Sequence, residues 1–447
     1  MRLTAALSET LKQTTPASLD DLSEELPEAL VVAALRSAGH QAKRRRSLPP
    51  EVVVWLAVAM AVFRDRSIEA VAAHLKLTAR TTGSGTGQSS SALVQARDRV
   101  GAAPVRAVFE YSAAYWALPS AHEHAWRGLS VFAVDGSTMR VADTPENEAT
   151  FGRPASAAGR GKSGYPQVRL VTLMAVRSHL LLGASFGPYR TSEGALAREL
   201  WPQLPDASVV IIDRGFVDYV TFHEIVTRGA DRHFLIRAKK NLRWRVVSKL
   251  GRGDDLVQLT VSRNARRKDP SIPETMMARV IRYRRKGFRP QRLITSLIDS
   301  EAYPAEEIRD LYHERWEIEL GYDEIKTHTL EREESHLRSK SPERVSQEMW
   351  GLLIAYNLVR RQIERFADAN EVSPHRVSYR GTLLLVRNVC VCAATGVGSV
   401  QKLLDTMNSE MKLLILPPRR DRRYPRAVKI KMSNYPRNTG KSRRAAR

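Results

Sequence analysis

Cysteine is almost absent from this chain of 447 residues, which contains only Cys390 and Cys392. Two cysteines cannot form the dense disulfide framework that stabilises many small secreted proteins. We do not expect a disulfide between them and interpret both as small apolar residues of the core. A protein of this composition fits a reducing compartment, so the sequence favours a cytoplasmic location.

Long hydrophobic runs are also missing. The longest, Val52 to Phe63, covers 12 residues, whereas a membrane-spanning helix needs about 20. We therefore predict no membrane helix and interpret this run as a buried helix. A secretory signal has a basic segment followed by an apolar one, and the N-terminus does not show this pattern.

Negative charge is scarce relative to positive charge. Lys and Arg number 71 against 48 Asp and Glu, which gives a formal net charge of +23. Such an excess favours a polyanionic partner, with nucleic acid first and an anionic membrane surface second. Two basic runs, Lys43 to Arg46 and the cluster between Arg419 and Arg423, could contact a DNA backbone without reading its sequence. A solvated tail is the alternative for the second run.

The hydrophobic period changes along the chain and divides it into regions. Residues 1–120 have helical spacing, whereas 127–238 and 294–370 alternate strand-like apolar runs with helical segments, as in an α/β core. Residues 239–293 are rich in Arg and Lys and alternate at strand spacing, which indicates a β-rich insertion. Residues 371–447 are predicted to form a helical region followed by a basic tail.

The segment from Tyr312 to Lys326 contains a specific set of polar residues. Tyr312, Arg315, Glu319 and Lys326 are separated by three, four and seven positions. On one continuous α-helix these residues would share a face, because each step adds about 100°. A phenol, a guanidinium, a carboxylate and an ammonium on one face suit a site that holds a metal ion and phosphates. The alternative is an ordinary solvated charged face.

Two other carboxylates follow predicted strands. Asp135 comes after the apolar run 129–134, and Asp213 after 209–212. We expect both strands to end at these residues, and in open α/β sheets chemistry collects at strand ends. With Glu319 they could form a carboxylate site for Mg²⁺ or Mn²⁺, which prefer oxygen ligands. Alternatively, each Asp is a turn former at a strand end.

These residues resemble the DDE transposases of the insertion-sequence-four family. The string Tyr-x2-Arg-x3-Glu-x6-Lys matches that family in full, and so does the context of Asp135 and Asp213. Three flanking motifs also match: Phe151-Gly152-Arg153-Pro154, Pro166-Gln167-Val168-Arg169 and the segment Leu337 to Glu343. The resemblance covers residues 20–370 or so. It implies an RNase H-like core interrupted by a β-rich insertion before Glu319, with a helical N-terminal DNA-binding region.

The resemblance also implies roles for the side chains. Asp135, Asp213 and Glu319 would bind two divalent metal ions in each active site. Arg315 and Lys326 would contact phosphates of the transposon end, with Tyr312 helping to position them. Arg214, directly after Asp213, is a further candidate for DNA binding.

Members of the family cut by water attack and then join the DNA ends through a hairpin intermediate, which requires an aromatic residue to stack on an extruded base. Trp244 is our candidate for that residue, and an ordinary half-buried Trp is the equally weighted alternative. Trp316, on the catalytic segment, is predicted to pack in the core instead.

Other signals are weaker. The segment Gly159 to Gly164 resembles a phosphate-binding loop but lacks the first glycine of that motif and precedes a strand, so we predict no nucleotide cofactor. His313, His328 and His336 have no Cys or His partners at zinc spacing.

The sequence thus predicts a transposase that acts on double-stranded DNA, both at terminal inverted repeats and at a target. A homodimer on paired ends follows from the resemblance alone. Two alternatives stay open: a non-catalytic DNA-binding protein with a transposase fold, and a metal-dependent nuclease that cuts without joining.

Overall fold

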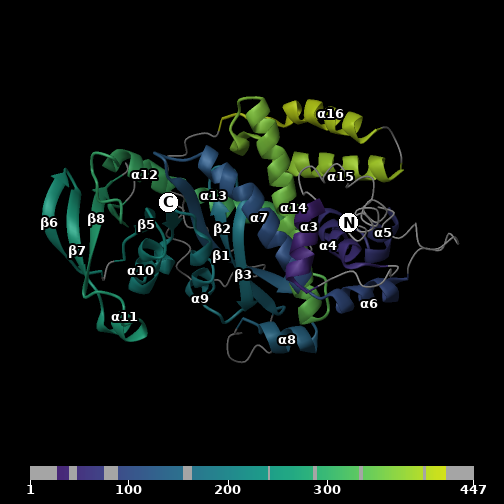
Figure 1. The fold of residues 1–447 in the computed structure, drawn as a ribbon, viewed down its shortest axis with the longest axis horizontal. Helices are drawn as coiled ribbons and strands as arrows, with labels where there is room; N and C mark the ends of the chain where they lie inside the picture. The colour runs from purple at the N-terminus through teal and green to yellow at the C-terminus, as the bar shows by residue number, and fades with distance from the viewer. Residues whose placement is uncertain are drawn as a thin grey trace, which may run out of the picture.

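A computed structural model describes residues 28–39, 48–74, 89–154, 164–239, 242–284, 289–331, 336–395 and 399–418. Figure 1 shows the whole chain. Three segments discussed above lie outside the described residues. They are the basic run 43–46, most of the segment 159–164 that resembles a phosphate-binding loop, and the basic cluster 419–423.

One sheet runs through the protein. Its strands are β1 (Ser130–Val141), β2 (Gln167–Ala175), β3 (Leu181–Pro188), β4 (Ser208–Ile212), β5 (Arg232–Arg237), β6 (Trp244–Gly251), β7 (Asp254–Thr260), β8 (Thr275–Tyr283), β9 (Gln291–Thr295) and β10 (His336–Leu337). In the described part of the chain they are ordered β3-β2-β1-β4-β5-β9-β8-β7-β6, and β10 pairs with β1.

The first five strands form an RNase H-like core, as the resemblance implied. Strands β1, β2 and β3 are antiparallel neighbours, whereas β4 pairs in parallel with β1 and β5 in parallel with β4. β4 consists of five buried residues, as expected for a central parallel strand covered on both faces.

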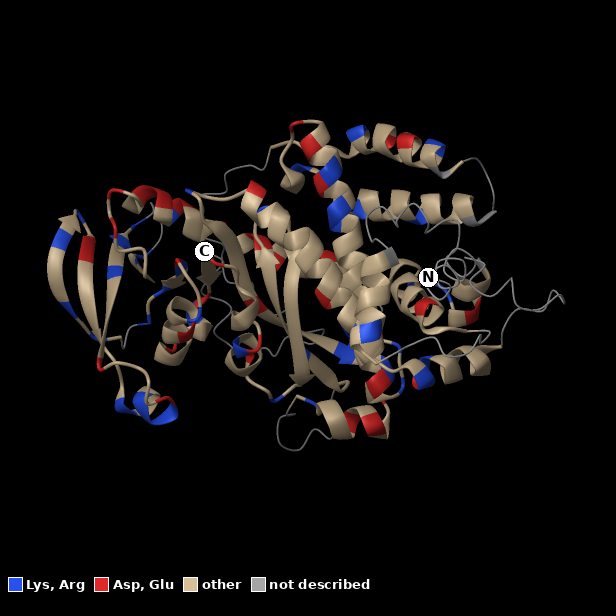
Figure 2. Ribbon diagram, in the orientation of Figure 1, with Lys and Arg blue, Asp and Glu red and all other residues tan. Residues whose placement is uncertain are grey.

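The basic segment between β5 and α12 continues this sheet. β9 pairs antiparallel with β5, and β8, β7 and β6 follow outward. The outermost strand, β6, is largely exposed. Figure 2 shows Lys and Arg distributed over these strands and over α11 (Arg263–Lys268), which lies at their lower end.

Helices surround the core strands. The N-terminal ones are α3 (Glu28–Ser37), α4 (Pro50–Val62), α5 (Ile68–His74), α6 (Ser90–Val100) and α7 (Ala103–Glu123). Within the core and the sheet extension lie α8 (Pro145–Phe151), α9 (Glu193–Arg198), α10 (Tyr219–Thr227), α12 (Ala305–His313) and α13 (Trp316–Asp323). The C-terminal part contains α14 (Pro342–Ala369), α15 (Tyr379–Thr395) and α16 (Val400–Met411).

Short helical turns complete the described part of the fold. The 3₁₀ turns among the described residues are η1 (Trp201–Gln203), η2 (Arg214–Phe216), η5 (Pro374–Arg376) and η6 (Lys412–Leu414). A π-helical turn, η3 (Glu324–Thr329), continues α13.

The long apolar run forms the buried helix that the sequence predicted. Every residue of α4 after Pro50 is buried, and the helix packs against α14. The two helices approach closely at Gly351, where an added Cβ would lie 2.5 Å from the carbonyl oxygen of Ala57. Any larger residue at position 351 would push the helices apart.

The flanking motif from Leu337 to Glu343 joins the N-terminal helices to the core. Glu343 accepts a hydrogen bond from the backbone of Ala102 (2.7 Å). Ser339 receives one from Arg97 (3.1 Å) and donates to Glu348, which also forms a buried ion pair with Arg64 (2.5 Å). These contacts give the motif a structural role, which sequence comparison alone does not reveal.

Cys390 and Cys392 lie on α15 and are not joined by a disulfide; Cys390 is buried, as predicted, whereas Cys392 is only half-buried.

Candidate active site

Asp135 lies on β1, and Asp213 directly follows the neighbouring parallel strand β4. The β1–β4 register pairs Val134 with Ile212, so the two aspartates occupy the next position on each chain. Neighbouring strands are about 4.8 Å apart. The prediction that the strand of Asp213 ends there is confirmed. The same prediction for Asp135 is wrong, because β1 continues to Val141 with β2 and β10 as hydrogen-bonding partners.

The backbone around Asp135 is fixed by a buried tyrosine that sequence reasoning missed. Tyr322 donates a hydrogen bond from its hydroxyl to the carbonyl of Asp135 (2.7 Å) and accepts one from the backbone of Thr172 (3.1 Å). The carboxylate of Asp135 accepts a hydrogen bond from the backbone of Gly136 (2.8 Å). Nothing in the spacing of Tyr322 distinguished it from an ordinary core residue.

A second carboxylate, that of Glu193, leaves space only for a glycine at position 136. A Cβ at this position would lie 2.5 Å from Cγ of Glu193, the first residue of α9. Glu193 is held there by Arg169, whose guanidinium is 2.6 Å from the carboxylate. Arg169 belongs to one of the flanking motifs, so this motif positions a charge next to the site.

The helix predicted from Tyr312 to Lys326 is not continuous, and this prediction is corrected. Helix α12 ends at His313, Glu314 and Arg315 form a tighter turn, and α13 begins at Trp316. In that turn, backbone amides bond to carbonyls three residues back, such as Arg315 to Tyr312 (3.3 Å). Lys326 then lies in the wider turn of η3. A uniform 100° step therefore does not describe this segment.

Arg315 nevertheless connects the carboxylates that the sequence analysis placed together. Its guanidinium is 2.8 Å from Oε1 of Glu319 and 3.9 Å from Oδ2 of Asp135. Asp213 acts electrostatically on the same guanidinium and on the Tyr312 phenol. The structure thus places Asp135, Asp213, Arg315 and Glu319 in one neighbourhood.

The environment of the site disfavours the ionised form of Asp135. Burial raises the pKa of Asp135 to about 6, and the charges of Glu193 and Glu319 add to this rise. The Gly136 amide and Arg315 oppose it. Burial would lower the pKa of Arg315, but Glu319 and its other anionic neighbours raise it overall.

Tyr312 and Lys326 have different neighbours in the site. Tyr312 is only 6% exposed, and burial raises its pKa to about 12. It can therefore support Arg315 and Asp213 more readily than it can contact DNA. Lys326 Nζ lies 3.3 Å from Oγ of Ser137 on β1, and burial, followed by the charge of Arg140, lowers its pKa.

The remaining predicted DNA contacts are Arg214 and Trp244. Arg214 is exposed on η2, directly after Asp213. Trp244 is half-buried at the start of β6, with the Arg292 guanidinium 5.1 Å from the centre of its ring. The prediction that Trp316 packs in the core is wrong, because 44% of this residue is exposed.

The donor set fits a hard divalent cation. Asp135, Asp213 and Glu319 offer carboxylate oxygens, the ligands that Mg²⁺ and Mn²⁺ prefer. The raised pKa of Asp135 reflects a site where a bound cation would relieve both desolvation and repulsion.

Comparisons with known proteins show the family of this chain. The family model described as transposase DDE domain matches residues 126–358, and the insertion element 4 transposase N-terminal model matches residues 16–110. The chain is 37% identical over 430 residues to the Escherichia coli K12 transposase InsG for insertion sequence element IS4, covering 96% of each chain. This chain belongs to the IS4 family of DDE transposases.

Two further similarities accompany these. The putative transposase InsZ of Escherichia coli K12 is 34% identical over 227 residues, which are 51% of this chain and 74% of InsZ. A cryo-EM structure of the piggyBac transposase synaptic complex with hairpin DNA has a TM-score of 0.42 and 10% identity, covering 90% of this chain and 86% of that one.

Family membership makes the protein a transposase, an enzyme that cleaves and transfers DNA. Divalent metal use follows from the DDE family. In the part of the transposase that the structure describes, no helix combines the length and the apolarity needed to cross a membrane.

Proposed function

We propose that the transposase cuts and joins DNA at Asp135, Asp213 and Glu319, which would hold two Mg²⁺ or Mn²⁺ ions. When bound, such ions activate the attacking oxygen and stabilise the leaving oxygen of a phosphodiester. The observation that carries the proposal is the position of Arg315, whose guanidinium links Glu319 to Asp135. Asp135 and Asp213 directly follow the paired residues Val134 and Ile212 of β1 and β4.

Arg315 serves two roles in this proposal. Without DNA it compensates the negative charge of Glu319 and Asp135. When a transposon end binds, its planar guanidinium can instead form paired hydrogen bonds to a phosphate, for which this group is well suited. Lys326 provides a second positive charge near Ser137, and Arg214 a third beside Asp213.

The proposed reaction is cut-and-paste transposition through a hairpin. Water attacks a phosphodiester at the transposon end and frees a 3′-hydroxyl, which attacks the opposite strand to form a hairpin. Water reopens the hairpin, and the 3′-hydroxyl attacks the target DNA. The extruded base would stack on Trp244, where Arg292 already lies against the ring. The exposed Trp316 is the second aromatic candidate.

The transposase is also proposed to act as a homodimer on paired ends. Helices α15 and α16 pack against each other and extend away from the sheet. They and the following turn expose Leu384 (47%) and Leu413 (86%). Exposed leucines on an outer helix pair suit contact with a second protomer.

The test combines the protein, DNA carrying the element's ends, target DNA and Mg²⁺. We expect nicked, hairpin and strand-transfer products, and none of them with Asp213→Ala, which should still bind ends. Cleavage without hairpins or joining would favour a nuclease instead. Binding by the wild-type protein without cleavage would favour a non-catalytic DNA-binding protein.

A further inference from the structure

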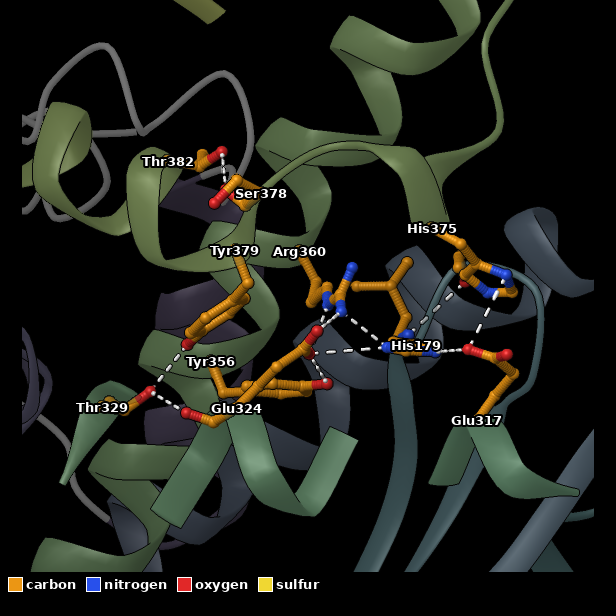
Figure 3. A network of polar contacts seen from close by, with 12 residues as sticks. His179, Glu317, Glu324, Thr329, Tyr356, Arg360, His375, Ser378, Tyr379 and Thr382 are labelled. Carbon is orange, nitrogen blue, oxygen red and sulfur yellow. Dashed lines mark hydrogen bonds and ion pairs between the residues drawn. The ribbon is translucent and has the colours of Figure 1, made fainter. Parts of the chain in front are cut away.

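The π-helical turn η3 presents Lys326 to the active site. The lysine lies in the middle of the turn, and its Nζ is 3.3 Å from Oγ of Ser137, two residues after Asp135. π-helical turns are rare and occur frequently at functional sites. Side chains of other elements contact both ends of this turn (Figure 3).

The first end of the turn is held by Arg360 of α14. Its Nε donates a hydrogen bond to Oε2 of Glu324 (2.9 Å), and its Nη2 contacts the other carboxylate oxygen. Tyr356 donates a further hydrogen bond to Oε2 (3.0 Å). Burial raises the pKa of Glu324, but the charge of Arg360 is the largest of the contacts that oppose burial and hold the pKa below its usual range. The carboxylate therefore stays ionised.

The same arginine connects this end to α13 through a buried histidine. Arg360 Nη2 lies 2.6 Å from Nδ1 of His179. Because a guanidinium can only donate, Nδ1 accepts and the ring proton lies on Nε2. That proton is directed at Glu317, 3.0 Å away.

This proton assignment also settles an alternative role for the histidine. His179, Glu317 and His375 have ligand atoms within 4.8 Å of one another, as a metal site would require. However, a metal ligand needs a free nitrogen lone pair, and Nε2 of His179 carries the proton. His179 instead supports α13 through its hydrogen bond to Glu317, and the ring of His375 lies against the ring of His179.

The second end of the turn is held by Tyr379 of α15. Thr329 donates its hydroxyl proton to the carbonyl of Glu324 (3.2 Å), so it accepts one from the hydroxyl of Tyr379, 2.8 Å away. Burial raises the pKa of Tyr379, which keeps this donor protonated. The guanidinium of Arg360 lies 5.4 Å from the centre of the Tyr379 ring, so the two supports touch each other.

We propose that Arg360 and Tyr379 are positioning residues, which act by fixing the two ends of η3 so that Lys326 faces the DNA. The inference rests on the proposed role of Lys326 as a phosphate contact. It gives the residues where α14 and α15 meet a role in DNA binding, although none of them belongs to the carboxylate site. Placement errors of about 1 Å can cost two orders of magnitude in rate, so loss of this support should reach the chemistry.

The test removes hydroxyl groups, since removing Arg360 would leave Glu324 charged, buried and unpaired. The variant is Tyr379→Phe combined with Thr329→Val, both close in shape to the original residues. The matched control is Thr327→Val, whose hydroxyl lies on the same turn but donates to Asp323 (2.6 Å). Each protein is measured alone and with Lys326→Ala, and melting temperature confirms folding.

Two readouts separate positioning from general stability. The first is the slope of log affinity for end DNA against log salt, which falls by about one for each lost phosphate contact. We expect this fall in the double variant and in Lys326→Ala, and no further fall when they are combined. The second is the first-strand cleavage rate at saturating DNA, which we expect to drop about tenfold in the double variant. In the Lys326→Ala background the extra loss should stay under about twofold, and Thr327→Val should match wild type.

If the losses in cleavage rate caused by the double variant and by Lys326→Ala multiply when the substitutions are combined, the inference is overturned. An unchanged salt slope in the double variant would also overturn it. An unchanged slope in Lys326→Ala would overturn it together with the role of that lysine, even if cleavage is intact. The salt slope is measured on binding alone. It therefore tests the positioning even if the wild-type protein fails to cleave, a result that would refute only the proposed function.

Discussion

Asp135→Asn should stabilise the metal-free transposase at neutral pH while abolishing its activity. Burial raises the pKa of Asp135 to about 6, above the ordinary value of 3.8. A carboxyl with a raised folded-state pKa binds its proton more tightly when folded, so ionising it costs stability. This cost is absent below about pH 4, grows as pH rises, and is complete above about pH 6.

The size of the effect follows from the pKa difference. A difference of about two corresponds to about 3 kcal/mol, which is an upper bound because the side chain is 22% exposed. Solvent screening of this partly exposed group reduces the gain, so we expect about 1–2 kcal/mol. For a domain of about 200 residues this raises the melting temperature by roughly 2–8 °C.

The assay is thermal unfolding in EDTA at pH 4 and pH 7.5, repeated with excess Mg²⁺. Asp135→Asn should melt higher than wild type at pH 7.5 and equal it at pH 4. Mg²⁺ should stabilise the wild type, because ligands that bind the folded state raise its stability, and should have little effect on the variant. The reasoning would be refuted by an asparagine variant that is less stable than wild type at pH 7.5 in EDTA.

Three other variants test separate parts of the structure. Gly136→Ala should reduce cleavage strongly, because its Cβ would displace Glu193, whereas Gly215→Ala, with open space around it, should cleave like wild type; equal rates would contradict the assigned contact. Trp244→Ala should slow hairpin formation by about tenfold while leaving the first nick unchanged, since stacking contributes about 1–3 kcal/mol per base; if only Trp316→Ala has this effect, the stacking role moves to that residue. Arg279→Met should lower the free energy of unfolding by about 3–5 kcal/mol in urea titrations, because it leaves the buried carboxylate of Asp254 (2.6 Å) unpaired, and Arg266→Met, whose partner Glu274 is exposed, is its matched control.

The core strands could be predicted from sequence because burial leaves a strong pattern. The apolar run 209–212 gives a central strand, and the acidic residue after it ends that strand. β1 was predicted too short, because Asp135-Gly136-Ser137 looks like a turn in isolation. The strand continues there because β2 and β10 supply hydrogen-bonding partners from distant parts of the chain, which no local pattern contains.

The neighbourhood of the candidate site was predicted more fully than its supports. Spacing and resemblance identified Asp135, Asp213, Arg315 and Glu319, and the structure brings them together. The change of helix type between Arg315 and Lys326 was missed, because it depends on Arg360 and Tyr379, which lie far along the chain. Trp316 was assigned to the core because aromatic residues usually are buried, but its side of α13 faces solvent.

Metal rescue tests the central claim most directly, namely that Asp135, Asp213 and Glu319 bind the same divalent ions. In Asp135→Cys and Asp213→Cys a thiolate replaces a carboxylate, and Mn²⁺ accepts sulfur more readily than the harder Mg²⁺. Cleavage of end DNA by both variants should be lost in Mg²⁺ and partly restored in Mn²⁺, whereas the alanine variants should stay inactive in both. Cleavage in Mg²⁺ at the wild-type rate by either cysteine variant would contradict the account.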